Sequence, residues 1–275
     1  MRLAADVPLQ TERSGKVQSV TRTLSILEAL AEYDDGVALS VLARHVGLPL
    51  STTHRLLTTL EERRFVSFDA RQMRWSIGLQ AFAVGQTFGR ARDLVRIGRP
   101  IMKMLMESTR ETVNLSIADD SSILYLAQVC PAHAILTFAR PGIRVPLHTS
   151  AAGKCVMAHW SEAEVDRFIA RHGLKRRTEN SVGSREQLAD HLEKAIQEGF
   201  ARDNQEFASG ARCVASPIFN EWGEPIGALS ISGPVHRMVL ERIAELGAAL
   251  VDAATRLTDT IGGDAENAHS IAASV

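Results

Sequence analysis

The chain has 275 residues, and its 45% hydrophobic and 23% charged content is that of an ordinary soluble globular protein. A formal net charge of −1 gives no overall basicity of the kind common in nucleic-acid-binding proteins. The charge is nevertheless uneven, because residues 1–92 carry twelve Lys and Arg against nine Asp and Glu, whereas the remainder carries nineteen against twenty-three. The N-terminal third is therefore the part that favours an anionic partner.

The sequence favours neither a membrane or secreted protein nor one built on disulfides or zinc. No apolar run approaches the roughly 20 residues that span a bilayer, and the first residues lack the apolar core of a signal peptide. Cys130, Cys155 and Cys213 lie far apart and form no CxxC pair, so we expect neither a disulfide framework nor a zinc site. We therefore expect a cytoplasmic protein with no membrane segment, metal or cofactor.

Residues 39–78 predict a helix-turn-helix followed by a β-hairpin. The first helix ends at Gly47, which tolerates a left-handed backbone, and Pro49 prevents the helix from continuing. We expect the hydroxyls of Ser40 and Ser51 to cap the first and second helices. This short spacing is typical of a DNA-binding helix pair.

The second helix has two different faces. Thr53, Leu56, Leu57 and Leu60 recur at helical spacing, so they are expected to pack inward. The opposite face carries small hydrogen-bonding side chains and one guanidinium, the chemistry that reads base edges in the DNA major groove. The candidate DNA contacts on this helix are Ser51, Thr52, Thr53, His54, Arg55 and Thr59.

The hairpin strengthens the prediction of DNA binding. Residues 65–68 and 74–77 alternate in character around the turn 69–72, as paired strands do. Arg71 and Arg74 lie at its tip or edge, where the wing of a winged helix contacts phosphates. A small helical bundle with a solvated charged face would explain the helices alone. The turn, the polar face and the basic hairpin together favour a DNA-binding domain.

The chain is much longer than a winged helix requires, so a second domain is expected. We place the winged helix-turn-helix at residues 16–78, a linker helix at 79–99 with a hinge over 90–99, and the second domain at 100–262. The helices flanking the helix-turn-helix are expected to bury their apolar positions, which are Val20, Leu24, Leu27, Leu30 and Ala31 before it and Leu79, Phe82, Ala83 and Phe88 after it.

The second domain combines helices with hairpin-forming strands, which makes the chain an α+β protein with an antiparallel sheet. The expected strands are 112–117, 123–129, 134–138, 144–147, 200–202, 212–219 and 225–232. The expected helices are 101–110, 151–159, 162–172, 185–198 and 235–260.

Three segments of this domain have the composition of a pocket for a small anion. Residues 148–154 open a helix with small side chains, including Ser150, so a ligand can approach the free N–H groups. Asp203 is followed by Cys213 at the start of an expected strand. Ser230 and Ser232 lie on one face of another strand, because side chains two residues apart in a strand point to the same side. Taken singly, each feature has an ordinary structural explanation as a cap, core filler or surface strand.

Enzymatic interpretations find less support. Gly153-Lys154 lacks the upstream glycine of a phosphate loop, and Cys155 replaces its Ser or Thr. Ser150 is four residues from Lys154 rather than three, so it does not match the SxxK nucleophile. A nucleophilic Cys213 remains open, because a distant histidine could meet it in space.

From about Lys16 to Thr260 the chain resembles the isocitrate-lyase-regulator (IclR) family of bacterial transcription factors. The resemblance is carried by GLPLSTTHRLLTTLEERRFV at 47–66 and GFARDNQEFASGARCVASPIFN at 199–220, and is extended by ETVNLSI at 111–117, PLHTSAAGK at 146–154 and ALSISGP at 228–234.

This resemblance implies a winged helix-turn-helix joined by a helix to a GAF-like effector-binding domain, in a protein that is not an enzyme. It implies binding to double-stranded DNA at a near-palindromic operator, as a homodimer that pairs into a dimer of dimers. The residues that it implies for holding a small carboxylate or semialdehyde are Ala151, Ala152, Asp203, Cys213, Ser230 and Ser232, and we add Ser150.

The pocket departs from members that sense glyoxylate or pyruvate. Their loop begins with Gly where this chain has Ala151, and they place bulkier Leu or Met where this chain has Ala134, Thr137, Val145 and Ala211. A roomier pocket favours a ligand of about C3–C5. We expect a repressor of a small catabolic operon; the alternatives are a regulator, activating or repressing, that responds to glyoxylate or pyruvate, an architectural DNA-binding protein, and an enzyme that uses Cys213.

Overall fold

The computed structural model describes residues 17–85, 89–132 and 140–264. The chain divides into two compact units, residues 1–88 and 89–275. Each unit has its own apolar core, as expected for two domains that are stabilised separately.

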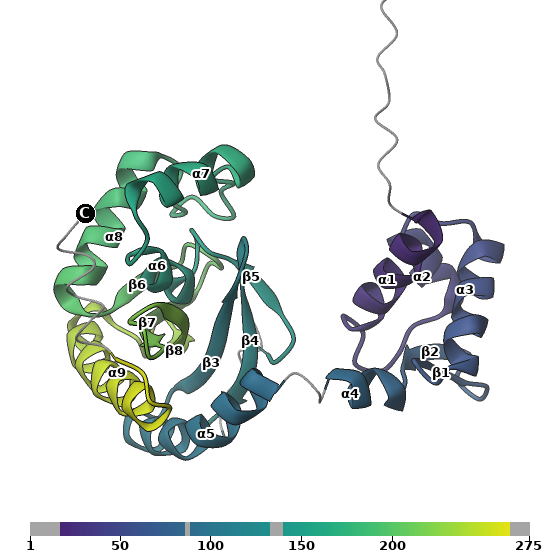
Figure 1. Ribbon diagram of the computed structural model, residues 1–275, viewed down its shortest axis with the longest axis horizontal. Helices are drawn as coiled ribbons and strands as arrows, with labels where there is room; N and C mark the ends of the chain where they lie inside the picture. The colour runs from purple at the N-terminus through teal and green to yellow at the C-terminus, as the bar shows by residue number, and fades with distance from the viewer. Residues whose placement is uncertain (1–16, 86–88, 133–139, 265–275) are drawn as a thin grey trace, which may run out of the picture. The chain divides into compact units, whose positions relative to one another are not determined.

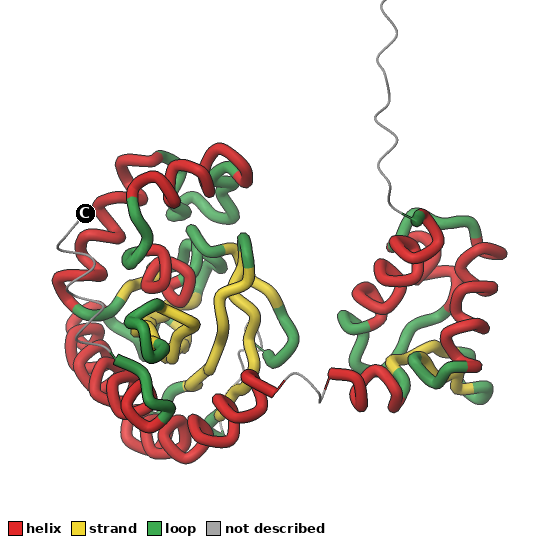
Figure 2. The backbone as a smooth tube through the Cα atoms, viewed as in Figure 1, coloured by secondary structure: helices red, strands yellow, loops and turns green. Residues whose placement is uncertain are grey.

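The described residues of the first unit form a three-helix bundle, a two-stranded hairpin and a short fourth helix (Figures 1 and 2). Its elements are α1 (Gln18–Leu30), α2 (Leu39–His45), α3 (Leu50–Glu62), β1 (Val66–Asp69), β2 (Arg74–Ile77) and α4 (Leu79–Gly85). Leu57 and Trp75 are buried in its centre with Ile26 of α1, so α1, α3 and the hairpin share one core. This is the winged helix-turn-helix that the sequence predicts.

The turn between α2 and α3 forms for the predicted reason, but the predicted side-chain caps of the two helices are absent. Gly47 has φ +66°, a left-handed conformation that most side chains disfavour. Ala38 and Pro49 occupy the N-cap positions of α2 and α3, and neither helix has a side-chain cap. Ser40 and Ser51 lie inside the helices, so their predicted capping role is wrong.

The apolar face predicted for α1 is only partly correct. Leu30 is buried and Leu27 is partly buried, as expected, but Val20 and Leu24 are 54% and 52% exposed. The core side of α1 is formed by Ile26, Ala29 and Leu30, because only its last turns lie against α2 and α3.

The helix that follows the hairpin is also more exposed than predicted. In α4, Leu79 and Phe82 are 77% and 61% exposed, and Ala83 is exposed as well. None of the residues of α4 is buried. Phe88 lies outside the described residues. The prediction that Leu79, Phe82 and Ala83 lie on a buried side is therefore wrong within the first unit, which presents apolar side chains on both α1 and α4.

The second unit is an antiparallel sheet covered by helices on both faces (Figures 1 and 2). Its helices are α5 (Gly89–Thr109), α6 (Ala151–Met157), α7 (Glu162–His172), α8 (Arg185–Glu198) and α9 (Leu240–Thr260). Its strands are β3 (Thr112–Asp119), β4 (Ser122–Val129), β5 (Arg144–Pro146), β6 (Ala201–Asn204), β7 (Ala211–Phe219) and β8 (Pro225–Pro234). The strand order is β5-β4-β3-β8-β7-β6, so β3 and β8 are central.

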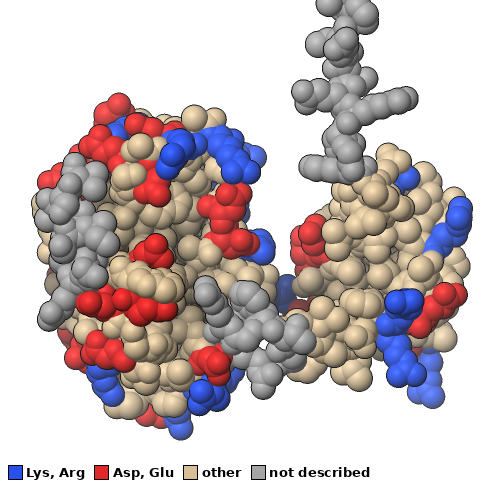
Figure 3. Space-filling view, in the orientation of Figure 1, with Lys and Arg blue, Asp and Glu red and all other residues tan. Residues whose placement is uncertain are grey.

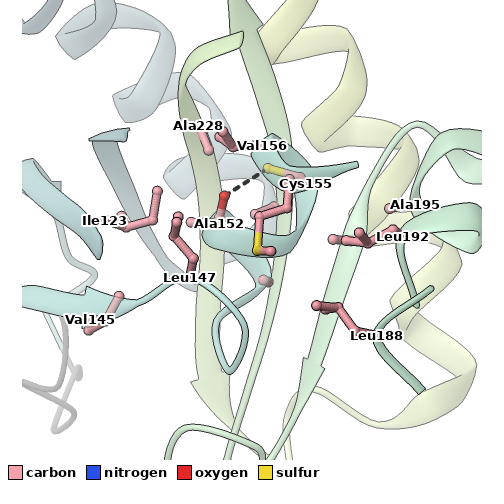
Figure 4. Packing of buried hydrophobic residues seen from close by; sticks show 14 of the residues in the cluster. Ile123, Val145, Leu147, Ala152, Cys155, Val156, Leu188, Leu192, Ala195 and Ala228 are labelled. Atoms are coloured by element: carbon pink, nitrogen blue, oxygen red, sulfur yellow. Dashed lines mark hydrogen bonds between the residues drawn. The ribbon is translucent and has the colours of Figure 1, made fainter. Parts of the chain in front are cut away.

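Alternation along the strands assigns one core to each face of the sheet. In β3, Val113 and Leu115 point to the face that α5 and α9 cover, where they join Leu250 of α9. The other face is covered by α6, α7 and α8. There Leu188, Leu192 and Ala195 of α8 face Cys155 of α6 (Figure 4).

The expected hinge over residues 90–99 is helical. A single helix, α5, runs from Gly89 to Thr109 with Pro100 inside it, and Gly98 packs against Leu115 and Leu257. The predicted strand at 134–138 lies outside the described residues. No helix in the described part of the chain is both long and apolar enough to cross a membrane.

Candidate functional sites

The second unit contains a cavity on the sheet face that α6 covers. It is lined by Tyr125, Gln128, Val145, Ser150, Ala151, Asp203, Phe207, Ala208, Ala211, Arg212, Cys213 and Ser232. Its volume of about 40 Å³ compares with the roughly 10–15 Å³ that one water requires, so it has space for about three waters or a small organic molecule.

Strand register brings the predicted polar residues together. Asp203 on β6 lies opposite Cys213 on β7, and Cys213 lies opposite Ser232 on β8. Directly paired residues point to the same face of a sheet, so the three side chains form one row across neighbouring strands. All three line the cavity, although they are far apart in sequence.

The start of α6 closes one side of the cavity. The Ser150 hydroxyl accepts a hydrogen bond from Gly153 N at 3.1 Å and donates to the Pro146 carbonyl at 2.9 Å, so it is committed to shaping the turn. Gly153 is required here, because a Cβ would lie 2.2 Å from the Leu147 carbonyl oxygen. No acceptor among the described residues takes the backbone N–H of Ala151 or Ala152.

Five of the seven predicted pocket residues line the cavity, and two lie just behind it. Ala152 and Ser230 are completely buried and do not line it. The Ser230 hydroxyl lowers the pKa of the Cys213 thiol, against the larger opposite effect of burial, so it acts on the cavity wall through a neighbour. Val145 and Ala211 line the cavity as predicted. Ala134 and Thr137 lie outside the described residues.

Sequence reasoning missed a carboxamide network beside this row. Asn114 Nδ2 donates to Ser232 Oγ at 3.1 Å and to Ser230 Oγ at 3.4 Å, and Gln128 Nε2 donates to Asn114 Oδ1 at 2.9 Å. The available signal was the alternation of Thr112, Asn114 and Ser116 along β3, which places polar side chains on one face of a central strand.

Burial controls the charge of Asp203. Its carboxyl is 8% exposed, and burial raises its pKa from 3.8 to about 7, opposed by the Lys154 ammonium and reinforced by Glu206. Backbone N–H groups of Glu206 and Phe207 donate to Asp203 Oδ1 at 2.6 and 3.4 Å. Near neutral pH this group can therefore be protonated or ionised within the cavity.

An ion pair lies directly behind Asp203. Lys154 on α6 is fully buried and its Nζ lies 2.5 Å from Glu206 Oε1, while His191 Nδ1 of α8 lies 2.9 Å from the same Nζ. Burial and the nearby Lys154 lower the pKa of His191 to about 4. The lysine that a phosphate loop would present to a ligand is instead committed to a buried carboxylate.

The Cys213 thiol is not activated by its surroundings. Burial, reinforced by the nearby Asp203 carboxylate, raises its pKa well above the usual value for a cysteine. The thiol donates weakly to the Val214 carbonyl at 3.6 Å. A nucleophilic cysteine needs the thiolate, and this environment disfavours it.

In the first unit, α3 presents the predicted polar face. Ser51, His54, Arg55 and Thr59 are exposed, and Thr52 is partly exposed. Thr53, however, is completely buried and its hydroxyl bonds the Pro49 carbonyl at 3.1 Å. Thr53 was expected both in the packed face and among the DNA contacts. It belongs to the packed face, because one helical position cannot serve both sides.

The two hairpin arginines differ in their surroundings. The Asp69 carboxylate accepts hydrogen bonds from the backbone N–H groups of Arg71 and Gln72, and these bonds fold the hairpin tip. The Arg71 guanidinium makes no hydrogen bond to any described residue. The Arg74 guanidinium donates to the Asp35 and Gly36 carbonyls at 3.3 Å. Figure 3 shows Lys and Arg side chains gathered on the hairpin side of this unit.

Both units match known protein domains. Residues 19–70 match the IclR helix-turn-helix domain, and residues 87–259 match the C-terminal domain of bacterial transcriptional regulator IclR. The chain is 41% identical over 252 residues to the transcriptional repressor IclR of Escherichia coli, covering 91% of this chain and 92% of that protein. It is 42% identical over 252 residues to the acetate operon repressor of Salmonella typhimurium, with the same coverage.

Solved structures agree with these matches. The IclR regulator from Alicyclobacillus acidocaldarius superimposes with a TM-score of 0.77 at 25% identity, over 90% of this chain and all of that one. Thermotoga maritima IclR gives a TM-score of 0.72 at 27% identity, over 89% and 98% of the two chains. A DNA-binding winged helix, a ligand-binding domain and these relatives lead to one conclusion: the chain belongs to the IclR family of bacterial transcriptional regulators.

Proposed function

We propose that this protein is a repressor that binds a near-palindromic operator through α3 and releases it when a small organic acid occupies the cavity of the second unit. The observation that carries the proposal is the row of Asp203, Cys213 and Ser232 beside the start of α6, which joins hydrogen-bonding groups from four elements around one small cavity. The repressors of Escherichia coli and Salmonella typhimurium at 41–42% identity support the sign of regulation.

In this proposal α3 enters the major groove. Arg55 is the guanidinium on its exposed face, and guanine O6 and N7 are the usual partners of such a group. Arg71 at the hairpin tip supplies a phosphate contact, with Arg74 nearby on the strand. The small donors Ser51, Thr52 and Thr59 and the ring of His54 complete the contact surface.

A near-palindromic operator requires a two-fold symmetric protein. The exposed apolar residues Leu24 of α1 and Leu79 and Phe82 of α4 would be covered in a homodimer formed through the first unit. Two such dimers would then associate through the second unit.

The effector that we propose is an oxo or hydroxy acid, or a semialdehyde, of about three to five carbons. The unpaired backbone N–H of Ala151 on the cavity wall suits its carboxylate, and the Val145 and Ala211 side chains leave space for its carbon chain. The alternative effectors, glyoxylate and pyruvate, remain in the test, because the cavity is small.

The proposal is tested by titrating the full-length protein into fluorescent DNA from upstream of its own gene. The titration is repeated with glyoxylate, pyruvate, succinate semialdehyde, 4-hydroxybutyrate and glutarate. We expect salt-sensitive binding that one of these acids weakens several-fold to a hundredfold, the range that a coupling of about 1–3 kcal/mol produces. Binding that persists unchanged with every acid would contradict the effector half of the proposal.

The cysteine enzyme is a second candidate that the same compounds address. A product formed from any of these acids, and lost in Cys213→Ser, would favour it. The raised pKa of the Cys213 thiol argues for the regulator instead.

A further inference from the structure

Asn114 lies in the central strand β3, immediately behind the wall of the cavity. Its side chain is completely buried, and it contacts polar groups on both neighbouring strands. Its Oδ1 accepts the 2.9 Å hydrogen bond from Gln128 Nε2, and its Nδ2 faces the hydroxyls of Ser230 and Ser232. A carboxamide has two N–H hydrogens, so one can serve each serine.

These hydrogen bonds determine which way the serine protons point. A hydroxyl oxygen that accepts a hydrogen bond must direct its own proton to another acceptor. Ser230 lies beside Cys213 and does not line the cavity, so its proton is not directed toward a ligand. Ser232 lines the cavity, and its hydroxyl makes no other hydrogen bond to any described residue, so its proton is available to a ligand.

We propose that Asn114 is a positioning residue that makes Ser232 a hydrogen-bond donor toward the cavity, so that the site selects ligands carrying a carboxylate or carbonyl oxygen at that point. This inference rests on the effector site proposed above. Without Asn114 the Ser232 oxygen would be free to accept, and the hydroxyl would no longer distinguish a ligand acceptor from a ligand donor.

Gln128 extends the same chain of hydrogen bonds. It reaches Asn114 from β4 and itself lines the cavity, so its donation to Asn114 Oδ1 holds the carboxamide with its NH₂ group toward the serines. The order of donation is then Gln128 to Asn114 to Ser232 to ligand. In a buried chain of this kind each hydrogen bond polarises the next.

The test is a double-mutant cycle between Asn114→Leu and Ser232→Ala. Leucine is close to asparagine in size but has no hydrogen-bonding group. Calorimetry measures binding of glyoxylate, pyruvate and succinate semialdehyde to the wild type, both single variants and the double variant. We expect each single substitution to weaken the tightest-binding acid about tenfold, and the double variant to bind no more weakly than Ser232→Ala alone. Effects that multiply would show that Asn114 acts independently of Ser232, and would overturn the inference.

Asn114→Asp supplies a second, sharper variant. An ionised aspartate can only accept from the two serines, so it turns the Ser232 proton away from the cavity, and at a pH where the carboxyl is ionised acid binding should fall further than in Asn114→Leu. Equal or tighter acid binding in Asn114→Asp would contradict the assigned polarity. Thermal unfolding and acid-free operator binding are measured for every variant, so that loss of fold is recognised; the Leu and Ala cycle decides the question if the Asp variant unfolds.

The outcomes separate the two proposals. If the wild type binds none of the three acids, the effector site itself is wrong and the role of Asn114 falls with it. If Ser232→Ala weakens acid binding but Asn114→Leu does not, the effector site stands and the role assigned to Asn114 is wrong.

Discussion

Lys154 and Glu206 form a buried ion pair, with 2.5 Å between Nζ and Oε1 and side chains 0% and 3% exposed. The pair joins α6, whose first residues border the cavity, to the segment that follows Asp203. Removing one member of such a pair leaves an uncompensated buried charge, which is far more costly than the loss of a surface pair.

Lys154→Met should therefore destabilise the second unit by about 3–5 kcal/mol, measured as the free energy of unfolding in urea. The double variant Lys154→Met/Glu206→Gln should recover most of this loss, because both charges are then absent. Lys103→Met is the matched control, since Lys103 pairs with Glu107 on an exposed helix surface and should cost under about 0.5 kcal/mol. A cost for Lys154→Met as small as that of the control would show that the pair does not stabilise the unit.

DNA recognition is assigned to the exposed face of α3. Arg55→Ala should weaken specific operator binding by about 1–3 kcal/mol, because its guanidinium is the strongest base-reading group on that face. Acid binding to the second unit should be unchanged. The neighbouring buried Thr53→Val is the control, and it should retain operator affinity while losing only its bond to the Pro49 carbonyl. Loss of operator binding in both variants would indicate disruption of the helix rather than loss of a contact.

Asp203 should make acid binding depend on pH. Its folded pKa of about 7 lies above the ordinary 3.8, so the folded protein holds this proton more tightly. Protonation stabilises the fold below about pH 4, and that contribution is lost as pH rises through 7. An ionised Asp203 repels an anionic ligand, so acid affinity should fall by up to about tenfold per pH unit above 7. Asp203→Asn should abolish this dependence in calorimetry; a wild-type affinity that is constant from pH 6 to 8.5 would exclude the linkage.

The size of the cavity should set the length of the preferred acid. The Val145→Leu/Ala211→Leu variant adds methylenes at two positions of the wall, so it should weaken four- and five-carbon acids by at least tenfold while sparing glyoxylate. Affinity is measured by calorimetry for each acid. Tighter binding of a four-carbon acid in this variant would contradict the assignment of a C3–C5 ligand.

The apolar surface of the first unit should mediate dimer formation. Leu79→Ser/Phe82→Ser removes two large exposed apolar side chains, so it should raise the dimer dissociation constant and weaken operator binding in parallel. Sedimentation equilibrium measures the association. Trp222→Ser is the control, because Trp222 is 60% exposed on the β7–β8 turn of the second unit. A dimer unaffected by the Leu79/Phe82 change would show that another surface joins the protomers.

The elements governed by local rules were predictable from sequence. Gly47 marks the turn, Leu57 and Leu60 mark the inner face of α3, and the two-residue period of β8 places Ser230 and Ser232 on one face. Each of these follows from a helical or strand repeat or from a single backbone requirement. The α+β organisation followed from the same repeats.

The remaining features depend on partners that sequence does not reveal. Phe82 and Leu24 have the spacing of buried residues, yet no described residue of the first unit covers them. Asn114 acquires its role from the register of β3 against β8, which brings it to residues more than 100 positions away. The pairing of Lys154 with Glu206 likewise depends on how α6 packs beside β6.

We expect operator and acid to bind two sites of one protein whose affinities are coupled. The most direct measurement is the reciprocal titration: operator affinity with and without saturating acid, and acid affinity with and without saturating operator, in one buffer. Thermodynamic linkage requires the acid to lower operator affinity by the same factor as the operator lowers acid affinity. We expect the two measured factors to be equal. An acid that binds equally well to the free protein and to the operator complex would contradict the account.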